Sequence, residues 1–169
     1  PQYRHRFTAA WIGGLVKGGC HFITPYMATA EGLTPRNRDI LAAIAAFYNT
    51  LKGICIIGGD WNMSPALLEQ SGFLDLVGGV VKAPPFPTCN QNTYDYFVVP
   101  RRLAAAVLKV QVVLDDGVRP HHPVRLVLAA NMRRLKTRTL SRPRKVDSLE
   151  GVVGPVAPPP DYSGTLDHL

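Results

Sequence analysis

The chain has 169 residues and a formal net charge of +7, with 46% hydrophobic and 18% charged residues, which is the composition of an ordinary globular protein. A chain of this length buries about two thirds of its unfolded surface, so it needs no disulfide or metal simply to stay folded. No apolar run approaches the roughly 18 residues of a membrane span, and we expect no membrane partner. Cys20, Cys55 and Cys89 are widely spaced and form no CxxC pair. We expect reduced thiols and an intracellular protein, with the cytoplasm and the nucleus both left open.

The first half of the chain predicts a hairpin, a helix and a buried strand. Two aromatic and β-branched segments, Tyr3–Ile12 and Cys20–Thr24, flank a glycine-rich connection, as in a β-hairpin. A threonine and a proline at positions 34 and 35 suit a helix start, and apolar residues recur at helical spacing up to Gly53. The continuous apolar run Ile54–Ile57 then predicts a strand buried on both faces.

The second half predicts further strands. A loop over 58–65 leads into a short helix, Ala66–Gln70, and a proline-rich loop follows at Ala83–Pro87. Strands are then predicted at Thr93–Val99, Ala105–Leu114 and Val124–Ala130. The mixed order of helices and strands indicates an α/β or α+β fold.

The positive charge is concentrated near the C-terminus of the sequence. Segment 119–145 holds nine basic residues and no acidic one, which favours nucleic acid as a partner, although a solvated tail is the alternative. The residues expected to contact phosphates are Arg133, Arg134, Lys136 and Arg138. From about Ser141 onward proline and glycine are frequent and large apolar residues are few, which predicts a flexible tail. We therefore divide the chain into a domain over 1–132 and a basic, then Pro/Gly-rich tail over 133–169.

Polar residues stand at the ends of three predicted strands, where such folds usually assemble a site. Asp60 and Asn62 follow the first buried strand. Asp95 lies inside an apolar strand, where an unpaired carboxylate is costly, so it should have a hydrogen-bonding partner. The pair His121-His122 precedes the last strand and offers that partner, because an aspartate fixes the imidazole tautomer and leaves the other nitrogen for a substrate.

Four short motifs resemble those of the endonuclease/exonuclease/phosphatase superfamily, the metal-dependent phosphodiesterases that include DNase I, abasic-site endonucleases and the endonuclease domains of non-LTR retrotransposons. HFITP at 21–25 is similar to the family's vYxP strand, GDWN at 59–62 to its GD(F/W/L)N motif, TYDYFVV at 93–99 to its (I/L)DY(I/F)xxS strand and PHHPV at 120–124 to its terminal SDHxPV motif. Their order and spacing also match. The resemblance implies half, or part, of a DNase I-like four-layer αββα sandwich with a mixed, mostly antiparallel sheet.

The resemblance also implies roles for individual residues. Asp60 would orient or deprotonate the attacking water, Asn62 would hold a phosphate oxygen, and His122, oriented by Asp95, would stabilise the charge of the transition state. His121 would stand in place of the family's metal-binding aspartate. The implied cofactor is Mg²⁺ or Mn²⁺; because imidazole is a poor ligand for Mg²⁺, we expect an altered metal preference or a loss of activity.

Structural alternatives to these roles stay open. An Asx turn that caps the following helix would explain Asp60 and Asn62. A purely structural pair would explain Asp95 and His122.

The family's N-terminal half normally supplies an Asn and the metal-binding Glu, and residues 1–25 contain no Asp, Glu or Asn. We therefore expect a truncated domain and leave open whether it is an enzyme. The first hypothesis is a divalent-metal-dependent phosphodiesterase or endonuclease acting on nucleic acid. The second is an inactive remnant that binds nucleic acid through its basic segment, and the third is a phosphatase-type member acting on phosphoinositides or other phosphoesters. A half sandwich exposes a sheet face, so a missing N-terminal half or a second copy is an expected partner.

Overall fold

The computed structural model describes residues 3–14, 18–114 and 119–129. These residues belong to the first of the two units into which the chain divides, 1–135 and 136–169. The predicted tail, the predicted boundary at 132/133 and the four basic residues Arg133, Arg134, Lys136 and Arg138 lie outside the described residues.

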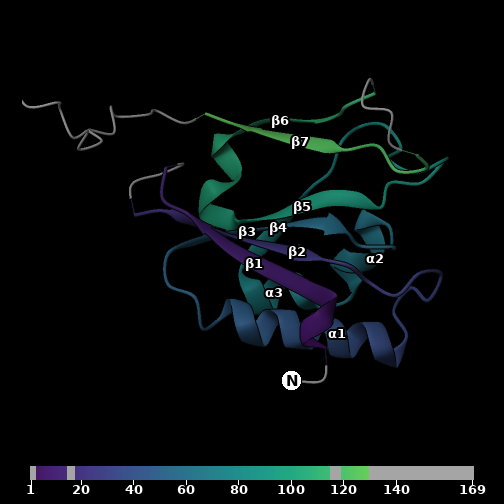
Figure 1. Ribbon diagram of the computed structural model, residues 1–169, viewed down its shortest axis with the longest axis horizontal. Helices are drawn as coiled ribbons and strands as arrows, with labels where there is room; N and C mark the ends of the chain where they lie inside the picture. The colour runs from purple at the N-terminus through teal and green to yellow at the C-terminus, as the bar shows by residue number, and fades with distance from the viewer. Residues whose placement is uncertain (1–2, 15–17, 115–118, 130–169) are drawn as a thin grey trace, which may run out of the picture. The chain divides into compact units, whose positions relative to one another are not determined.

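A five-stranded mixed sheet with the strand order β1-β2-β3-β5-β4 forms the centre of the fold (Figure 1). Its strands are β1 (Phe7–Ile12), β2 (Cys20–Pro25), β3 (Ile54–Asp60), β4 (Gly79–Lys82) and β5 (Asp95–Pro100). Strands β2 and β3 run parallel, and the other neighbours in this sheet run antiparallel. A second, two-stranded antiparallel sheet consists of β6 (Val107–Val112) and β7 (Val124–Leu128). The predicted hairpin and the predicted mixed, mostly antiparallel sheet are confirmed.

Three α-helices cover one face of the large sheet: α1 (Pro35–Tyr48), α2 (Pro65–Gln70) and α3 (Phe73–Val77) (Figure 1). Helix α1 connects the parallel strands β2 and β3, and it buries Ile40, Leu41 and Ile44 against them. Trp61 completes this core: it is fully buried and stacks on Tyr96 with ring centroids 5.5 Å apart. Among the described residues no helix is long and apolar enough to span a membrane.

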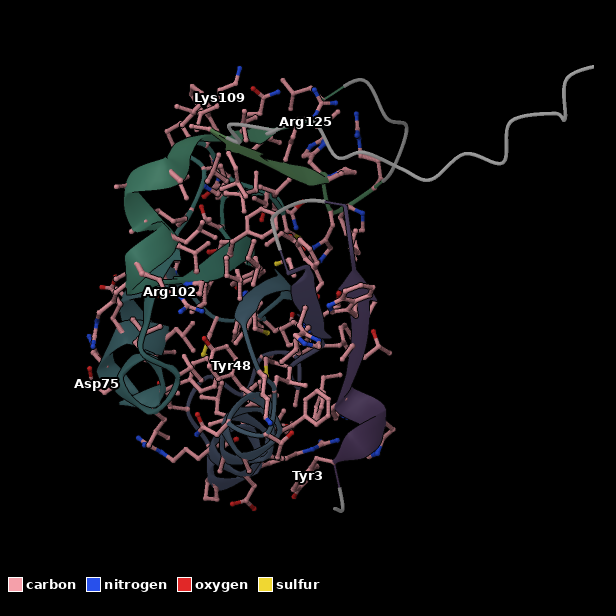
Figure 2. All side chains as sticks on the ribbon, turned by 90° about the vertical axis from the view of Figure 1, so that its left-hand side faces the viewer. Tyr3, Tyr48, Asp75, Arg102, Lys109 and Arg125 are labelled. Atoms are coloured by element: carbon pink, nitrogen blue, oxygen red, sulfur yellow. The ribbon has the colours of Figure 1, made fainter. Side chains whose placement is uncertain are left out.

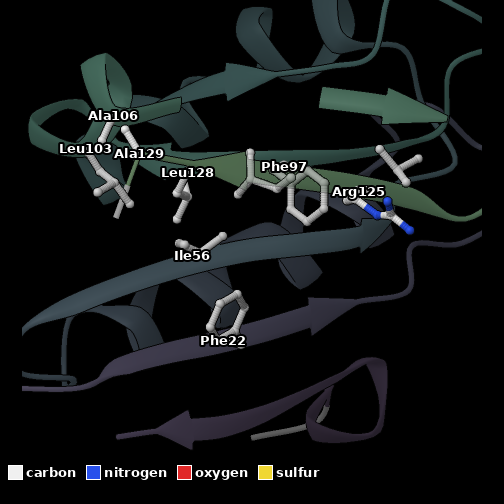
Figure 3. A pocket seen from close by; sticks show the side chains of 10 residues that line it. Phe22, Ile56, Phe97, Leu103, Ala106, Arg125, Leu128 and Ala129 are labelled. Carbon is white, nitrogen blue, oxygen red and sulfur yellow. The ribbon is translucent and has the colours of Figure 1, made fainter. Parts of the chain in front are cut away.

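The opposite face of the sheet is covered by β6, β7 and the 3-10 helix η2 (Arg101–Ala106); a second short 3-10 helix, η1 (Arg4–Arg6), precedes β1. This smaller core centres on Cys20, Ile56 and Val99. An apolar groove of about 430 Å³ remains between the two sheets. Figure 3 shows Phe22 and Ile56 of the large sheet on one side of the groove and Leu128 of β7 on the other.

The three cysteine thiols are free, as predicted, and all three are buried. Burial raises the pKa of the Cys55 thiol to about 12. Cys55 therefore stays a neutral, apolar core residue.

The structure differs from the sequence-based expectation around β3. The glycines at 58 and 59 predict a loop, but β3 continues through them to Asp60. Their lack of a side chain serves close packing: a Cβ at Gly58 would lie 2.4 Å from the Phe97 ring, and one at Gly59 would lie 2.5 Å from the Pro25 carbonyl oxygen. Helix α1 also ends at Tyr48 rather than near Gly53, and α3 and β4 were not predicted at all.

We expect Gly58→Ala to lower the free energy of unfolding by about 1–3 kcal/mol, because the new methyl group must displace the Phe97 ring over the strand. Urea denaturation measures this loss. Gly14→Ala is the matched control: a Cβ there meets no atom within 4 Å, and the change should stay within about 0.5 kcal/mol. Equal stability of the two variants would show that the contact between Gly58 and Phe97 does not constrain β3.

Candidate active site

The candidate site lies where β3 ends and β5 begins. Asp60 is the last residue of β3 and pairs directly with Asp95, the first residue of β5. Side chains two residues apart in a strand share a face, so Asp95 lies on the same face as Phe97, which lines the groove. Both carboxylates therefore stand at one end of the space between the two sheets.

Asn62 holds the Asp60 carboxylate in place. The Asn62 backbone N–H donates to Asp60 Oδ1 at 3.0 Å, and its side-chain Nδ2 donates to Asp60 Oδ2 at 3.0 Å and to the Met27 carbonyl at 3.1 Å. An Asx turn is thus present. The other part of that structural alternative is wrong, because the cap of α2 is Ser64, whose side chain accepts from Leu67 N. Both Nδ2 protons of Asn62 are engaged, so the expected bond to a phosphate oxygen requires one of them to leave its present acceptor.

The imidazole bonded to Asp95 belongs to His121. His121 Nδ1 lies 2.8 Å from Asp95 Oδ2, while Nε2 lies 4.0 Å from Asp60 Oδ2. A carboxylate only accepts, so Nδ1 carries the proton and donates it, and Nε2 faces Asp60. The second distance is too long for a hydrogen bond and leaves both groups available to a bound molecule.

The prediction that Asp95 pairs with His122 is therefore wrong. His121 forms a β-bridge with Cys89, and successive side chains of an extended segment point to opposite sides. His122 accordingly points away from the dyad, and its Nδ1 lies 3.3 Å from Arg119 Nη1. The sequence held the signal: the pattern SDHxPV has one residue between its histidine and its proline, and counting back from Pro123 reaches His121.

The same count changes the expected metal ligand. The family's aspartate position then falls on Pro120, which has no ligating side chain. His121, expected in that position, instead belongs to the only group of metal-capable side chains identified among the described residues: Asp60, Asp95 and His121, whose ligand atoms lie within 4.8 Å of one another.

The electrostatic balance at Asp60 favours its neutral form more than usual. Burial raises the pKa of its carboxyl above the ordinary value of 3.8, and the nearby Asp95 carboxylate raises it further. The hydrogen bonds from Asn62 and the His121 imidazole act in the opposite direction without cancelling the rise. Burial, Asp95 and Asp60 likewise raise the pKa of the Cys89 thiol, so a thiolate ligand or nucleophile is disfavoured there.

Two fully buried polar residues support the site and were missed in the sequence. Asn37 bonds to the backbone N–H and the carbonyl of Ala28 at 2.9 and 3.1 Å, which fixes the loop whose Met27 carbonyl accepts from Asn62. Thr88 bonds to the backbone at the start of β5. Neither occupies a position that periodicity or a motif marks, because their roles depend on backbone groups distant in the sequence.

Comparisons with known proteins identify the fold. No family model and no curated protein match the sequence. Among solved structures, a 3'-5' exonuclease (NExo) from Neisseria meningitidis matches with 19% identity and a TM-score of 0.54, over 73% of this chain and 64% of that one. The endonuclease domain of TRAS1, a telomere-specific non-LTR retrotransposon, matches with 16% identity and a TM-score of 0.53, over 76% and 70%.

The cytolethal distending toxin from Actinobacillus actinomycetemcomitans matches with 19% identity and a TM-score of 0.53, over 70% of this chain and 51% of that chain. The chain therefore spans about half the length of this toxin chain. The fold is DNase I-like, as predicted, and two of these neighbours are named as an exonuclease and as an endonuclease domain.

We expect the Asp60 carboxyl to titrate above 3.8 in metal-free buffer, because burial and Asp95 disfavour its charge. With a raised folded pKa the native state binds more protons than the unfolded state, so the wild type loses stability as pH rises from the unfolded to the folded pKa. Asp60→Asn lacks this loss. Its stability relative to the wild type should rise through that window and then stay constant.

Urea denaturation between about pH 3.5 and 7 measures the difference, and a ¹³C NMR titration of the Asp60 carboxyl measures the pKa directly. A pKa at or below 3.8 would contradict the prediction.

Proposed function

We propose that this chain is part of a divalent-metal-dependent phosphodiester hydrolase that acts on nucleic acid. The observation that carries the proposal is the convergence of Asp60 and the Asp95–His121 dyad at one end of the intersheet groove. Hydrolysis of a phosphodiester needs a group that accepts a proton from water and a group that stabilises charge on the departing or equatorial oxygen, both within reach of one phosphate.

The proposal divides these tasks among the residues as follows. Asp60 orients the attacking water and accepts its proton, for which a raised pKa is an advantage. His121 directs Nε2 toward the phosphate and, in its charged form, donates from that atom to the oxygen on which charge develops. Asp95 fixes the ring through Nδ1, and Asn62 fixes Asp60.

The side chains present fit a divalent cation. Two carboxylates and one imidazole are suitable ligands for Mn²⁺ and less so for Mg²⁺, which prefers oxygen alone. Asp60 and Asp95 would hold the ion, which would polarise the phosphate and neutralise its charge. His121 would join them as a ligand only in its neutral form, in which Nε2 carries no proton and the ion instead of the imidazolium stabilises the developing charge.

Nucleic acid is the proposed substrate class. Two of the structural neighbours are named as an exonuclease and as a retrotransposon endonuclease. Arg119 and Arg125 are exposed and lie on the segment that carries the dyad histidine. Figure 2 shows Arg125 with Lys109 at the end of the molecule formed by β6 and β7. Arg133, Arg134, Lys136 and Arg138, which lie outside the described residues, are the further phosphate contacts that we propose.

The proposal includes a further polypeptide segment over the groove. Strand β1 has five of its six residues exposed and carries no charge, and the groove is lined by apolar residues such as Phe22, Ile56 and Leu126. Such surfaces are normally covered. The occupant is either the N-terminal half that the resemblance implies or a second copy of this chain.

The test is nicking of supercoiled plasmid by the purified chain in molar excess with Mn²⁺. We expect slow nicking that stops when the metal is chelated, because Pro120 offers no ligand and no glutamate is present at the site among the described residues. His121→Ala should reduce the rate by about 10²–10⁴-fold.

His122→Ala is the matched control, because His122 lies outside the dyad, and it should keep the wild-type rate. Equal loss in both variants, or nicking that survives His121→Ala, would contradict the assigned roles. Complete absence of nicking by the wild type would favour the inactive-remnant alternative.

The inactive-remnant alternative rests on the clustering of nine basic residues in segment 119–145. An inactive remnant would bind nucleic acid without sequence preference, and log K against log salt should slope by about −0.7 to −0.9 per neutralised phosphate. Deleting everything from Met132 onward removes seven of the nine basic residues and should weaken binding by orders of magnitude at moderate salt. Equally tight binding by the shortened protein, measured by fluorescence anisotropy, would show that the segment is a solvated tail.

A further inference from the structure

Thr88 occupies the point where the two segments of the dyad meet. It lies in the loop before β5 and is fully buried. Its hydroxyl oxygen accepts from the backbone N–H groups of Tyr94 at 2.9 Å and Asp95 at 3.0 Å. A single side-chain atom thus anchors the residue that bears the catalytic carboxylate, at the position where β5 begins.

The backbone of Thr88 anchors the histidine segment at the same time. Its carbonyl accepts from His122 N at 2.7 Å, and its own N–H donates to the Asn92 carbonyl at 2.8 Å. The next residue, Cys89, forms the β-bridge with His121. The backbones of Asp95 and of His122, the neighbour of His121, are therefore both attached to Thr88.

We propose that Thr88 is a positioning residue that sets the geometry of the Asp95–His121 dyad through its hydroxyl. The inference rests on the proposed function of that dyad. It goes beyond that function because it assigns the distance between Asp95 Oδ2 and His121 Nδ1 to a residue that touches neither atom.

The physical reason is that the N–H groups of Tyr94 and Asp95, two partly buried residues, need an acceptor. Without the Thr88 hydroxyl, the N–H groups of Tyr94 and Asp95 have lost their acceptor. An unsatisfied backbone N–H group inside a protein destabilises the folded state. The start of β5 then shifts or opens to reach water. A displacement of about 1 Å is enough to break a hydrogen bond between side chains, whereas the bond from His122 N to the Thr88 carbonyl is unaffected because it is a backbone bond.

The test is NMR of the metal-free chain with ¹⁵N-labelled histidine. In the wild type we expect a His121 Nδ1–H proton that exchanges slowly with water, assigned by its absence in His121→Gln. Thr88→Val has nearly the same shape but no hydroxyl, and it should lose this signal. Thr88→Ser keeps the hydroxyl and should retain the signal.

Thr50→Val is the matched control. The Thr50 hydroxyl is exposed and donates to the Phe47 carbonyl at 2.7 Å. Thr50 precedes β3, whose first residue, Ile54, lies about 20 Å along the strand from Asp60. This variant should keep the His121 signal. A Thr88→Val protein that keeps the signal, or a folded Thr88→Ser protein that loses it, would overturn the proposal.

A second measurement decides the matter if Thr88→Val does not fold. In the wild type, the amide protons of Tyr94 and Asp95 should exchange at least about tenfold more slowly than exposed loop amides, because Thr88 holds them. Rapid exchange at both would overturn the proposal. Neither measurement uses metal or nucleic acid, so a dyad that depends on Thr88 in a chain that never nicks DNA would contradict the proposed function alone.

Discussion

The antiparallel pairing of β3 with β5 is the constraint on which the rest of the site depends. It sets Asp60 opposite Asp95, two residues that are 35 positions apart in the sequence. The pairing needs glycine at 58 and 59, because the Phe97 ring and the Pro25 carbonyl lie where side chains would otherwise project. Close packing and the placement of Asp60 thus both constrain the same short strand. The two glycines, which in the sequence predict a loop, allow β3 to continue to Asp60.

Placing two carboxylates side by side is unfavourable, and the surrounding groups show how the fold tolerates it. Asn62 gives Asp60 two hydrogen bonds, and His121 gives Asp95 one. Burial still leaves the pKa of Asp60 raised. The site therefore retains an electrostatic cost that a cation or a bound proton would relieve, as is common where a fold favours function over stability.

The sequence predicted the hairpin, helix α1 and the strands near 54, 95 and 124, because apolar periodicity and turn residues dominate there. It missed α3 and β4, which are only five and four residues long, too short for a periodic signal. The sequence motifs placed Asp60, Asn62 and Asp95 near one another, but we assigned the bond with Asp95 to His122, whereas the structure assigns it to His121. Which neighbour of an extended pair faces inward depends on the bridge to Cys89, which periodicity does not show; only the spacing of the SDHxPV pattern, counted back from Pro123, marks His121 in the sequence.

The long sequence separations within the site have a kinetic consequence. The bond between His121 and Asp95 closes a loop of 26 residues, and the bonds from Asn62 to Met27 and from Trp61 to Tyr96 each span 35. A contact between residues far apart in the sequence costs loop-closure entropy before it provides any stabilisation. Such contacts therefore slow folding and form late on the pathway. The pairing of Cys20 with Ile54 spans 34 residues as well, so the sheet and the dyad should both form late. An intact dyad therefore reports that the chain has folded rather than merely collapsed.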